Sequence, residues 1–374
     1  MRVLIAGQSL GAIGGVQTYE RDLATWLLGR GHTPIVYGTE LGESARQLAR
    51  LTIPFTDDLQ SVAAPIDIIH GDSPVETMTA LLHFPNTPAL FVCHSWGGVA
   101  LTTPHFPRIL QYVAVDDTCA DRLLLREAIA PEKLSVLLNA VDIEKFGQRS
   151  PLPRKPRRAV VFGNLAHEMT SLPVIREACR RASLDLDVIG ASAGTATEHP
   201  ESIIGRYDIA FAKAKCAMEA MASGVAVILC DAPGIGGMVR SNDVDRLRRL
   251  NFGVRTLQKP LSAETLLDEI ARYDADDARE VSNRIRMLAS SDALHESLFA
   301  LYENVIDEYT STIRNDGWIA ESRAAAVFLH DLAVLDRHFN RRLVTLAKAS
   351  QRVLEMPIIG PIATRMLNWF VRRR

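Results

Sequence analysis

Short apolar runs alternate with segments of helical periodicity over the first 150 residues of the chain. The run RVLIA at residues 2–6 predicts a buried strand, the following GQSLGAIGG a glycine-rich loop, and residues 16–30 a helix with apolar positions three and four apart. Further buried strands are predicted at residues 33–38, 66–70, 89–94, 111–116 and 134–139, mostly with helical segments between them. Continuous apolar strands of this length are typical of a parallel sheet covered by helices on both faces.

A basic, proline-rich segment interrupts this pattern at RSPLPRKPRR (149–158). Its three prolines exclude a helix or a central strand, so we interpret it as a linker. The alternation then restarts, with strands predicted at 159–164, 184–190, 207–212 and 225–231 and helices at 172–182 and 216–224. We therefore predict an N-terminal Rossmann-like domain at 1–152 and a C-terminal one at 153–314 that face each other across a cleft.

The last part of the chain differs in character from the rest. Residues 262–310 predict one or two helices, and residues 323–354 a long helix whose apolar positions follow spacings of three, four or seven. The segment 315–374 holds ten Lys or Arg against five Asp or Glu, although the whole chain has a net charge of −2. This basic helical extension has two alternative roles: contact with an anionic membrane surface, or formation of a homodimer through paired helices.

Composition narrows the class of protein. The chain has 374 residues, 47% of them hydrophobic and 23% charged, as in a globular protein of two domains and an appendage. Its five cysteines form no CxxC pair, which argues against a disulfide framework or a zinc site. No signal peptide and no spanning helix are expected, and the near-zero charge does not favour nucleic acid. We expect a cytoplasmic protein, with peripheral contact at the inner face of the membrane if the extension binds lipid.

Three segments resemble glycosyltransferase family 4, a group of retaining enzymes with the GT-B fold. Residues 2–38 are similar to the family's opening, VLLNAVDIEKF (136–146) to the signature that ends its first domain, and residues 206–239 to its donor-binding strand, loop, helix and strand. The resemblance covers about residues 1–310 and is that of a divergent member. It implies an α/β fold of two doubly wound Rossmann-like domains, followed here by the helical extension.

Glycines and an acid at predicted strand–helix turns are candidates for nucleotide-sugar binding. Gly14 and Gly15 lie where the first strand turns into the first helix, and backbone N–H groups and the helix dipole favour an anion there. The alternative is a tight turn that packs the helix against the strand. Glu219 lies near the start of a helix that follows a strand. The resemblance implies that its carboxylate contacts the ribose, and the alternative is an acid that complements the helix dipole.

Two lysines and a histidine are candidates for the reaction itself. Lys213 and Lys215 come just before the helix of Glu219, where cations can balance a departing diphosphate in place of a metal ion. The alternative is a pair of solvated surface lysines. His94 ends a predicted strand, and the resemblance implies contact with the donor sugar, against the alternative of a hydrogen-bonded core histidine.

The chain also departs from the family pattern. The family's GRLxxxKG is replaced by GNLAHEMT, so that Asn164 and Met169 stand where Arg and Lys grip the diphosphate, and Phe211 takes the place of the family's first glutamate. We keep Asn164 as a donor-site candidate. We also expect Gly234, Gly236 and Gly237 to form a flexible loop that lets the backbone approach the donor.

The resemblance implies transfer of a hexose from a nucleotide sugar to a hydroxyl of a sugar or lipid-linked acceptor, in cell-envelope polysaccharide or glycolipid synthesis. The nucleotide sugar is a co-substrate, and neither a cofactor nor a metal is expected, because the resemblance is to GT-B enzymes, which need no DxD metal motif. Two alternatives stay open. The lost Arg and Lys suggest a catalytically degenerate sugar-nucleotide-binding scaffold, and a sugar-nucleotide epimerase shares the same architecture.

Overall fold

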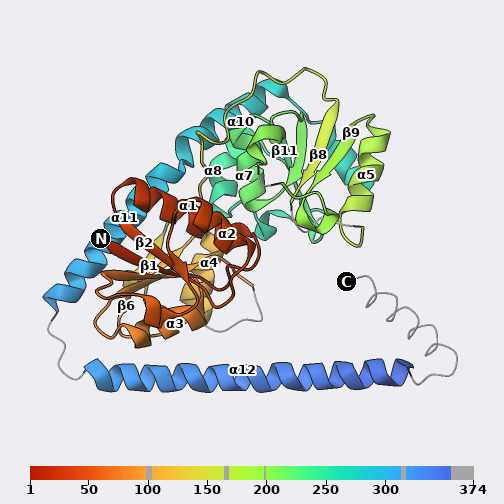
Figure 1. The fold of residues 1–374 in the computed structure, drawn as a ribbon. Coiled ribbons are helices and arrows are strands. Elements are labelled where there is room, and N and C mark those ends of the chain that lie inside the picture. The colour runs from red at the N-terminus through yellow and green to blue at the C-terminus, as the bar shows by residue number, and fades with distance from the viewer. Residues whose placement is uncertain (98–102, 164–167, 198, 313–316, 355–374) are drawn as a thin grey trace. The chain divides into compact units, whose positions relative to one another are not determined.

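The computed structural model describes residues 1–97, 103–163, 168–197, 199–312 and 317–354 (Figure 1). Of residues 342–354 it describes only the helical backbone. Residues 1–98 and 108–313 form one compact unit, and residues 99–107 and 314–374 form a second.

A parallel seven-stranded sheet forms the first half of the larger unit. Its strand order is β3-β2-β1-β4-β5-β6-β7, and every neighbouring pair is parallel. The order changes direction between β1 and β4, which creates the switch point where open α/β sheets bind ligands at the carboxyl ends of their strands. The strands are β1 (Arg2–Ala6), β2 (Thr33–Tyr37), β3 (Phe55–Thr56), β4 (Ile68–Gly71), β5 (Ala89–Cys93), β6 (Ile109–Ala114) and β7 (Leu134–Val136), and the helices are α1 (Gly15–Gly29), α2 (Glu43–Arg50), α3 (Pro74–His83) and α4 (Asp117–Asp121).

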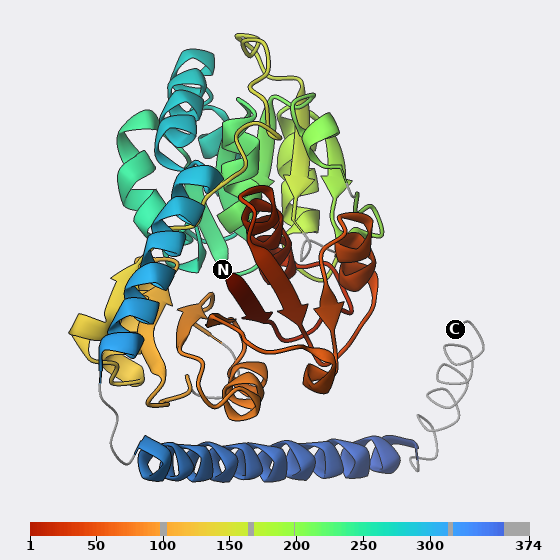
Figure 2. The same ribbon diagram turned by 60° about the vertical axis from the view of Figure 1, so that its left-hand side comes forward.

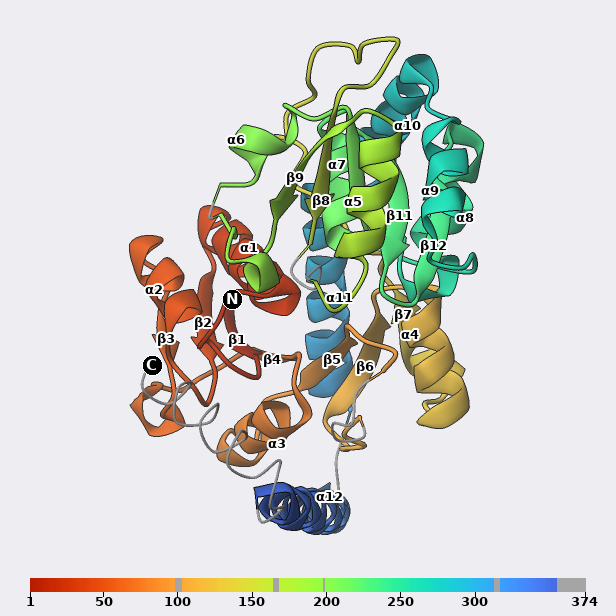
Figure 3. The same cartoon turned by 90° about the vertical axis from the view of Figure 1, so that its right-hand side faces the viewer.

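A five-stranded sheet of order β12-β11-β10-β8-β9 forms the second half (Figure 3). Alternate residues of its strands enter two separate cores: in β10, Ala210 and Ala212 pack on one face while Ile209 and Phe211 pack on the other. The first core includes residues of α7 and α10, and the second includes residues of α5 and α9. Both faces are thus buried, as the continuous apolar runs predicted. The elements are β8 (Arg158–Phe162), α5 (Leu172–Arg181), β9 (Asp185–Ile189), α6 (Glu201–Ile204), β10 (Ile209–Ala212), α7 (Ala214–Ala222), β11 (Ala226–Asp231), β12 (Gly234–Met238), α8 (Val244–Arg249), α9 (Ala263–Ile270) and α10 (Ala275–Leu288).

The prediction of a glycine loop after β11 is wrong. Gly234, Gly236 and Gly237 belong to strand β12, which turns back antiparallel to β11. The glycines are needed for close packing: a Cβ at Gly236 would lie 2.8 Å from Leu229 Cβ and 2.9 Å from the Thr256 carbonyl oxygen. Glycine content alone does not distinguish an open loop from a strand pressed against neighbouring backbone.

Helix α11 (Ser291–Ser311) returns to the first half, whereas we predicted it as part of the second. It packs on β5, β6 and α1, and Figures 1 and 2 show it passing from the second sheet to the first. The Trp26 indole donates to Asp292 over 2.6 Å, and the Tyr302 hydroxyl lies 2.7 Å from His70 Nδ1. The tertiary contacts of α11 therefore override the proximity in sequence on which the prediction rested.

The long C-terminal helix is confirmed as α12 (Gly317–Leu354), of 38 residues. It exposes Trp318, Val327 and Phe339, which are 71%, 62% and 61% accessible. None of the helices in the described part of the chain is long and apolar enough to cross a membrane.

Candidate active site

A cavity of about 180 Å³ brings together residues from both halves of the larger unit. Its lining includes Gly15 at the amino end of α1, His94 after β5, Asn139 after β7 and Lys215 in the first turn of α7. Three of these four were predicted site residues that lie far apart in sequence. Asn139 was part of a family-like segment but was not singled out.

The turn into α1 leaves backbone N–H groups available at the edge of this cavity. Gly14 is the N-cap, with extended φ of −138°, and the described structure gives it no side-chain cap. A Cβ at Gly15 would meet nothing within 4 Å, so this position is open rather than filled. The unsatisfied N–H groups of a helix's first turn, together with the helix dipole, favour an anion here.

His94 is held by a buried carboxylate that sequence reasoning missed. Its Nε2 lies 2.7 Å from Oδ1 of Asp72, whose side chain is wholly buried, while the His94 side chain is 12% exposed. The ring of Tyr19 meets the His94 ring edge-on, with centroids 4.7 Å apart. Asp72 follows β4 at the carboxyl edge of the sheet, and that position after a predicted strand was the signal that could have identified it.

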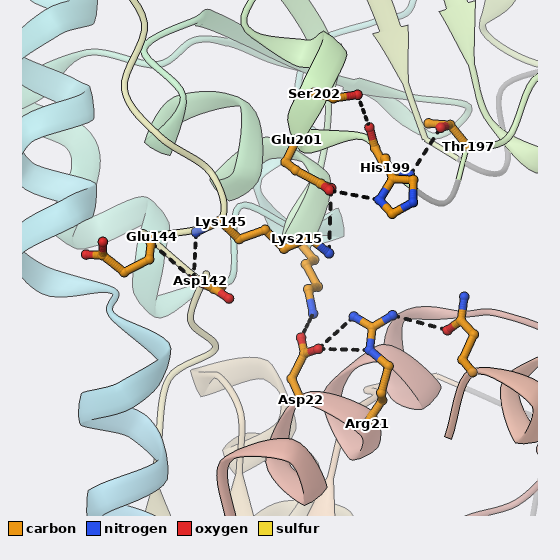
Figure 4. Close-up of polar contacts among 11 residues, drawn as sticks. Arg21, Asp22, Asp142, Glu144, Lys145, Thr197, His199, Glu201, Ser202 and Lys215 are labelled. Atoms are coloured by element: carbon orange, nitrogen blue, oxygen red, sulfur yellow. Dashed lines mark hydrogen bonds and ion pairs between the residues drawn. The ribbon is translucent and has the colours of Figure 1, made fainter. Parts of the chain in front are cut away.

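Lys215 reaches across to the first half of the unit. Its Nζ lies 3.4 Å from Oδ2 of Asp22 on α1, and Arg21 donates to Oδ1 of the same carboxylate over 2.7 Å (Figure 4). Burial alone would raise the pKa of Asp22, but Lys215 and Arg21 outweigh it and hold the pKa below its ordinary value. A cation therefore stands at the small cavity, paired with a carboxylate that was not predicted.

The structure separates the two predicted lysines. Lys213 is the N-cap of α7, forms an ion pair with Asp231 at the end of β11, and does not line the small cavity. Only Lys215 faces that cavity. The sequence could not distinguish them, because the residue at which α7 begins decides which lysine is the extended N-cap and which lies in the first turn.

Glu219 lies two-thirds of the way along α7 and is 8% exposed. Burial raises its pKa from an ordinary 4.5 to about 7; Lys215 acts in the opposite direction and Asp22 adds to the rise. Its carboxyl group therefore interacts electrostatically with Lys215 and Asp22, although it lines neither described cavity. The predicted contact with ribose stays a prediction.

The structure describes two of the positions at which the sequence departs from the family pattern. Phe211 is 1% exposed in the core beside α5, so no side chain at that position reaches the cavity. Met169 is 89% exposed. Asn164 lies outside the described residues.

A second cavity, of about 770 Å³, adjoins the first and shares Asp22, Asp142, Ser291 and His295 with it. Burial lowers the pKa of His295 to about 4, so this side chain is neutral at physiological pH. Lys145 lies 3.6 Å from Glu201, which also contacts His199 at 3.1 Å (Figure 4). The larger cavity therefore has walls of mixed charge from both halves of the unit.

Among the described residues, no group of three or more His, Cys, Asp or Glu is arranged to hold a metal ion.

Comparison with known proteins relates this geometry to an activity. The model of glycosyltransferase family 4 matches residues 13–145, which contain α1, His94 and Asn139. The chain carries a glycosyltransferase family 4 domain. No curated protein matches the sequence.

Solved structures of similar fold include a glycosyltransferase, the protein HepE and a sucrose-phosphate synthase. A glycosyltransferase from Rickettsia africae is 15% identical, with a TM-score of 0.59 over 82% of this chain and 98% of that one. HepE from Anabaena, solved in complex with UDP, is 12% identical, with a TM-score of 0.60 over 81% of this chain and 100% of that one. Sucrose-phosphate synthase from Thermosynechococcus elongatus is 14% identical, with a TM-score of 0.55 over 82% of this chain and 99% of that one.

The predicted fold is thereby confirmed: two α/β halves of the GT-B type with a helical C-terminal region. The family match and the fold together indicate that the chain is a glycosyltransferase.

Proposed function

We propose that the chain transfers a hexose from a nucleoside diphosphate sugar to a hydroxyl acceptor, with retention of anomeric configuration. The observation that carries this proposal is the small cavity between the two halves. An open helix amino end at Gly15, a histidine at a strand end and the cation Lys215 converge there. HepE, which shares the fold, has been solved with UDP and with UDP-glucose, and this supports a donor of that class.

In this proposal the diphosphate lies between the amino end of α1 and Lys215. The N–H groups at Gly14 and Gly15 and the Lys215 ammonium stabilise the negative charge that develops on the leaving diphosphate. The ammonium exchanges its contact with Asp22 for the phosphate. No metal ion or other cofactor is required, because backbone dipoles and a side-chain cation supply the positive potential.

The remaining predicted residues take positions around the sugar and the nucleoside. His94 contacts the donor sugar and Glu219 contacts the ribose, and Asn164, which stands in the sequence where the family has its diphosphate-gripping Arg, is kept as a donor-site candidate. Lys213 supports the site indirectly through Asp231, as the second cation at the start of α7. Retention then follows a front-face route in which the leaving phosphate assists attack by the acceptor hydroxyl.

Titration calorimetry with a panel of sugar nucleotides tests the donor site. We expect UDP-glucose or another member of the panel to bind, and Lys215→Ala to weaken binding at least about tenfold, because a charge-assisted hydrogen bond contributes about 1.5–3 kcal/mol. Lys155→Ala, which removes an exposed cation from the linker, is the matched control and keeps the wild-type affinity. Absence of binding by the whole panel would refute the proposal and favour a scaffold. Conversion of the bound sugar to its epimer without release of UDP would favour an epimerase.

We place the reaction in cell-envelope polysaccharide or glycolipid synthesis, with a sugar or lipid-linked acceptor. Residues 315–374 carry the membrane contact or the homodimer in this scheme. Exposed Trp318 and Phe339 on α12 and the RRR terminus support lipid contact. Co-sedimentation of the full chain with anionic but not neutral vesicles supports the membrane, whereas a dimer by light scattering without co-sedimentation supports the homodimer.

A further inference from the structure

A continuous hydrogen-bonded chain leads from helix α11 through the core of the first half to His94. The Tyr302 hydroxyl lies 2.7 Å from His70 Nδ1. His70 Nε2 lies 3.2 Å from Asp72 Oδ1, and the same oxygen lies 2.7 Å from His94 Nε2. Tyr302, His70 and Asp72 are wholly buried, and only His94 reaches the cavity.

The donors along this chain follow from its chemistry. Oδ1 of Asp72 lies within hydrogen-bonding distance of both Nε2 atoms, and a carboxylate oxygen can accept from two N–H donors at once. An ionised carboxylate can only accept, so both Nε2 atoms donate to it. In a neutral His70 the Nδ1 atom is then an acceptor, and Tyr302 must donate to it. Burial raises the pKa of Tyr302 well above 10, so its hydroxyl keeps the proton.

We propose that Tyr302, His70 and Asp72 are positioning residues that fix His94 in the neutral tautomer with its proton on Nε2, leaving Nδ1 as an acceptor toward the cavity. The group that Nδ1 recognises is a hydroxyl of the donor sugar. Recognition of a sugar hydroxyl by Nδ1 rests on the proposed function, whereas the tautomer of His94 does not depend on it. A histidine acts as donor or acceptor according to the bond its other nitrogen makes, so a buried partner decides which sugar group it can bind.

The fold explains why this hydrogen-bonded chain includes a residue of α11. His70 and Asp72 lie at the end of β4 and His94 follows the neighbouring strand β5, so the sheet alone brings the two imidazoles to one carboxylate. Tyr302 comes from α11, 232 residues beyond His70 in sequence. The helix that crosses from the second half thus completes the hydrogen bonding of the histidine that faces the donor.

The first test reads the tautomer directly in the full chain without ligand. Long-range ¹H–¹⁵N spectra of ¹⁵N-histidine-labelled protein at pH 8, where histidines are ordinarily neutral, are expected to show His94 as the Nε2–H tautomer. His94→Gln assigns the signal. An Nδ1–H tautomer or an imidazolium at pH 8 would overturn the proposal whether or not the chain binds nucleotides. Asp72→Asn is expected to shift His94 toward a mixture of tautomers, and an unchanged spectrum would also overturn it.

The second test separates positioning from general stability by comparing UDP-glucose with UDP. Tyr302→Phe is expected to weaken UDP-glucose about tenfold, by analogy with the loss of affinity when the hydrogen-bond partner behind a metal-ligating histidine is removed, and to leave the affinity for UDP unchanged. A merely structural loss would weaken both ligands equally and contradict the proposal. Tyr273→Phe, which removes a hydroxyl that donates to the Pro153 carbonyl over 2.8 Å in the second half, is the matched control. If the wild-type chain binds neither ligand, the proposed function fails. The tautomer of His94 is then still tested by the spectra of the ligand-free protein.

Discussion

Replacing Glu219 by Gln is expected to remove a pH-dependent loss of stability. Burial raises the pKa of Glu219 from 4.5 to about 7, so the folded state holds this proton more tightly than the unfolded state. The stabilising contribution is therefore complete below pH 4.5 and is lost as pH rises through 7. Between pH 5 and pH 8 the loss amounts to about 2.5 kcal/mol in the free energy of unfolding.

Urea unfolding followed by circular dichroism at pH 5, 6, 7 and 8 measures this difference. The wild-type chain should lose about 2.5 kcal/mol more than Glu219→Gln over that interval. Glu280→Gln, at an exposed position of α10, should follow the wild-type curve. Parallel pH curves for the wild type and Glu219→Gln would refute the reasoning, because they would mean that this carboxyl group ionises equally easily in the folded and unfolded states.

Three further substitutions test single features. Gly15→Ala should not lower the melting temperature, since a Cβ there meets nothing within 4 Å and alanine favours the helix more than glycine. The added methyl group at the edge of the cavity should weaken UDP-glucose binding in calorimetry, and unchanged affinity would contradict contact between the donor and this end of α1. Gly236→Ala should lower the free energy of unfolding by about 1–3 kcal/mol, because its Cβ would lie 2.8 Å from Leu229 Cβ and 2.9 Å from the Thr256 carbonyl oxygen. An unchanged free energy of unfolding would contradict that packing. Glu20 is 1% exposed, and burial, followed by neighbouring carboxylates, raises its pKa from 4.5 to about 9. Wild-type stability should therefore fall between about pH 5 and 9 by more than that of Glu20→Gln, and equal falls in thermal melts would count against this reasoning.

The alternation of strands and helices could be predicted because it depends on short-range patterns. The runs at residues 2–6, 89–94 and 207–212 all became buried parallel strands, since burial on both faces requires uninterrupted apolar sequence. The path of α11 could not be predicted in this way. Its packing on the first sheet depends on contacts such as that of Tyr302 with His70, which no local pattern contains.

Residues of the site could be predicted where they lie at the ends of strands and helices, because the sequence pattern locates those ends. Gly15, His94 and Lys215 were identified by position at such ends, and the fold brings them to one cavity. Asp72 and Asp22 were missed because their importance lies in the partner that each one holds, across the sheet or between the two halves. Pairing of this kind is a property of the tertiary structure.

A crystal structure of the full chain with UDP-glucose tests the central claim most directly. The account predicts the diphosphate between the amino end of α1 and the Lys215 ammonium, with that ammonium released from Asp22 and the sugar hydroxyls within reach of His94. A ligand seated instead in the larger cavity beside Trp26 and Arg50, with the contact between Lys215 and Asp22 intact, would contradict it.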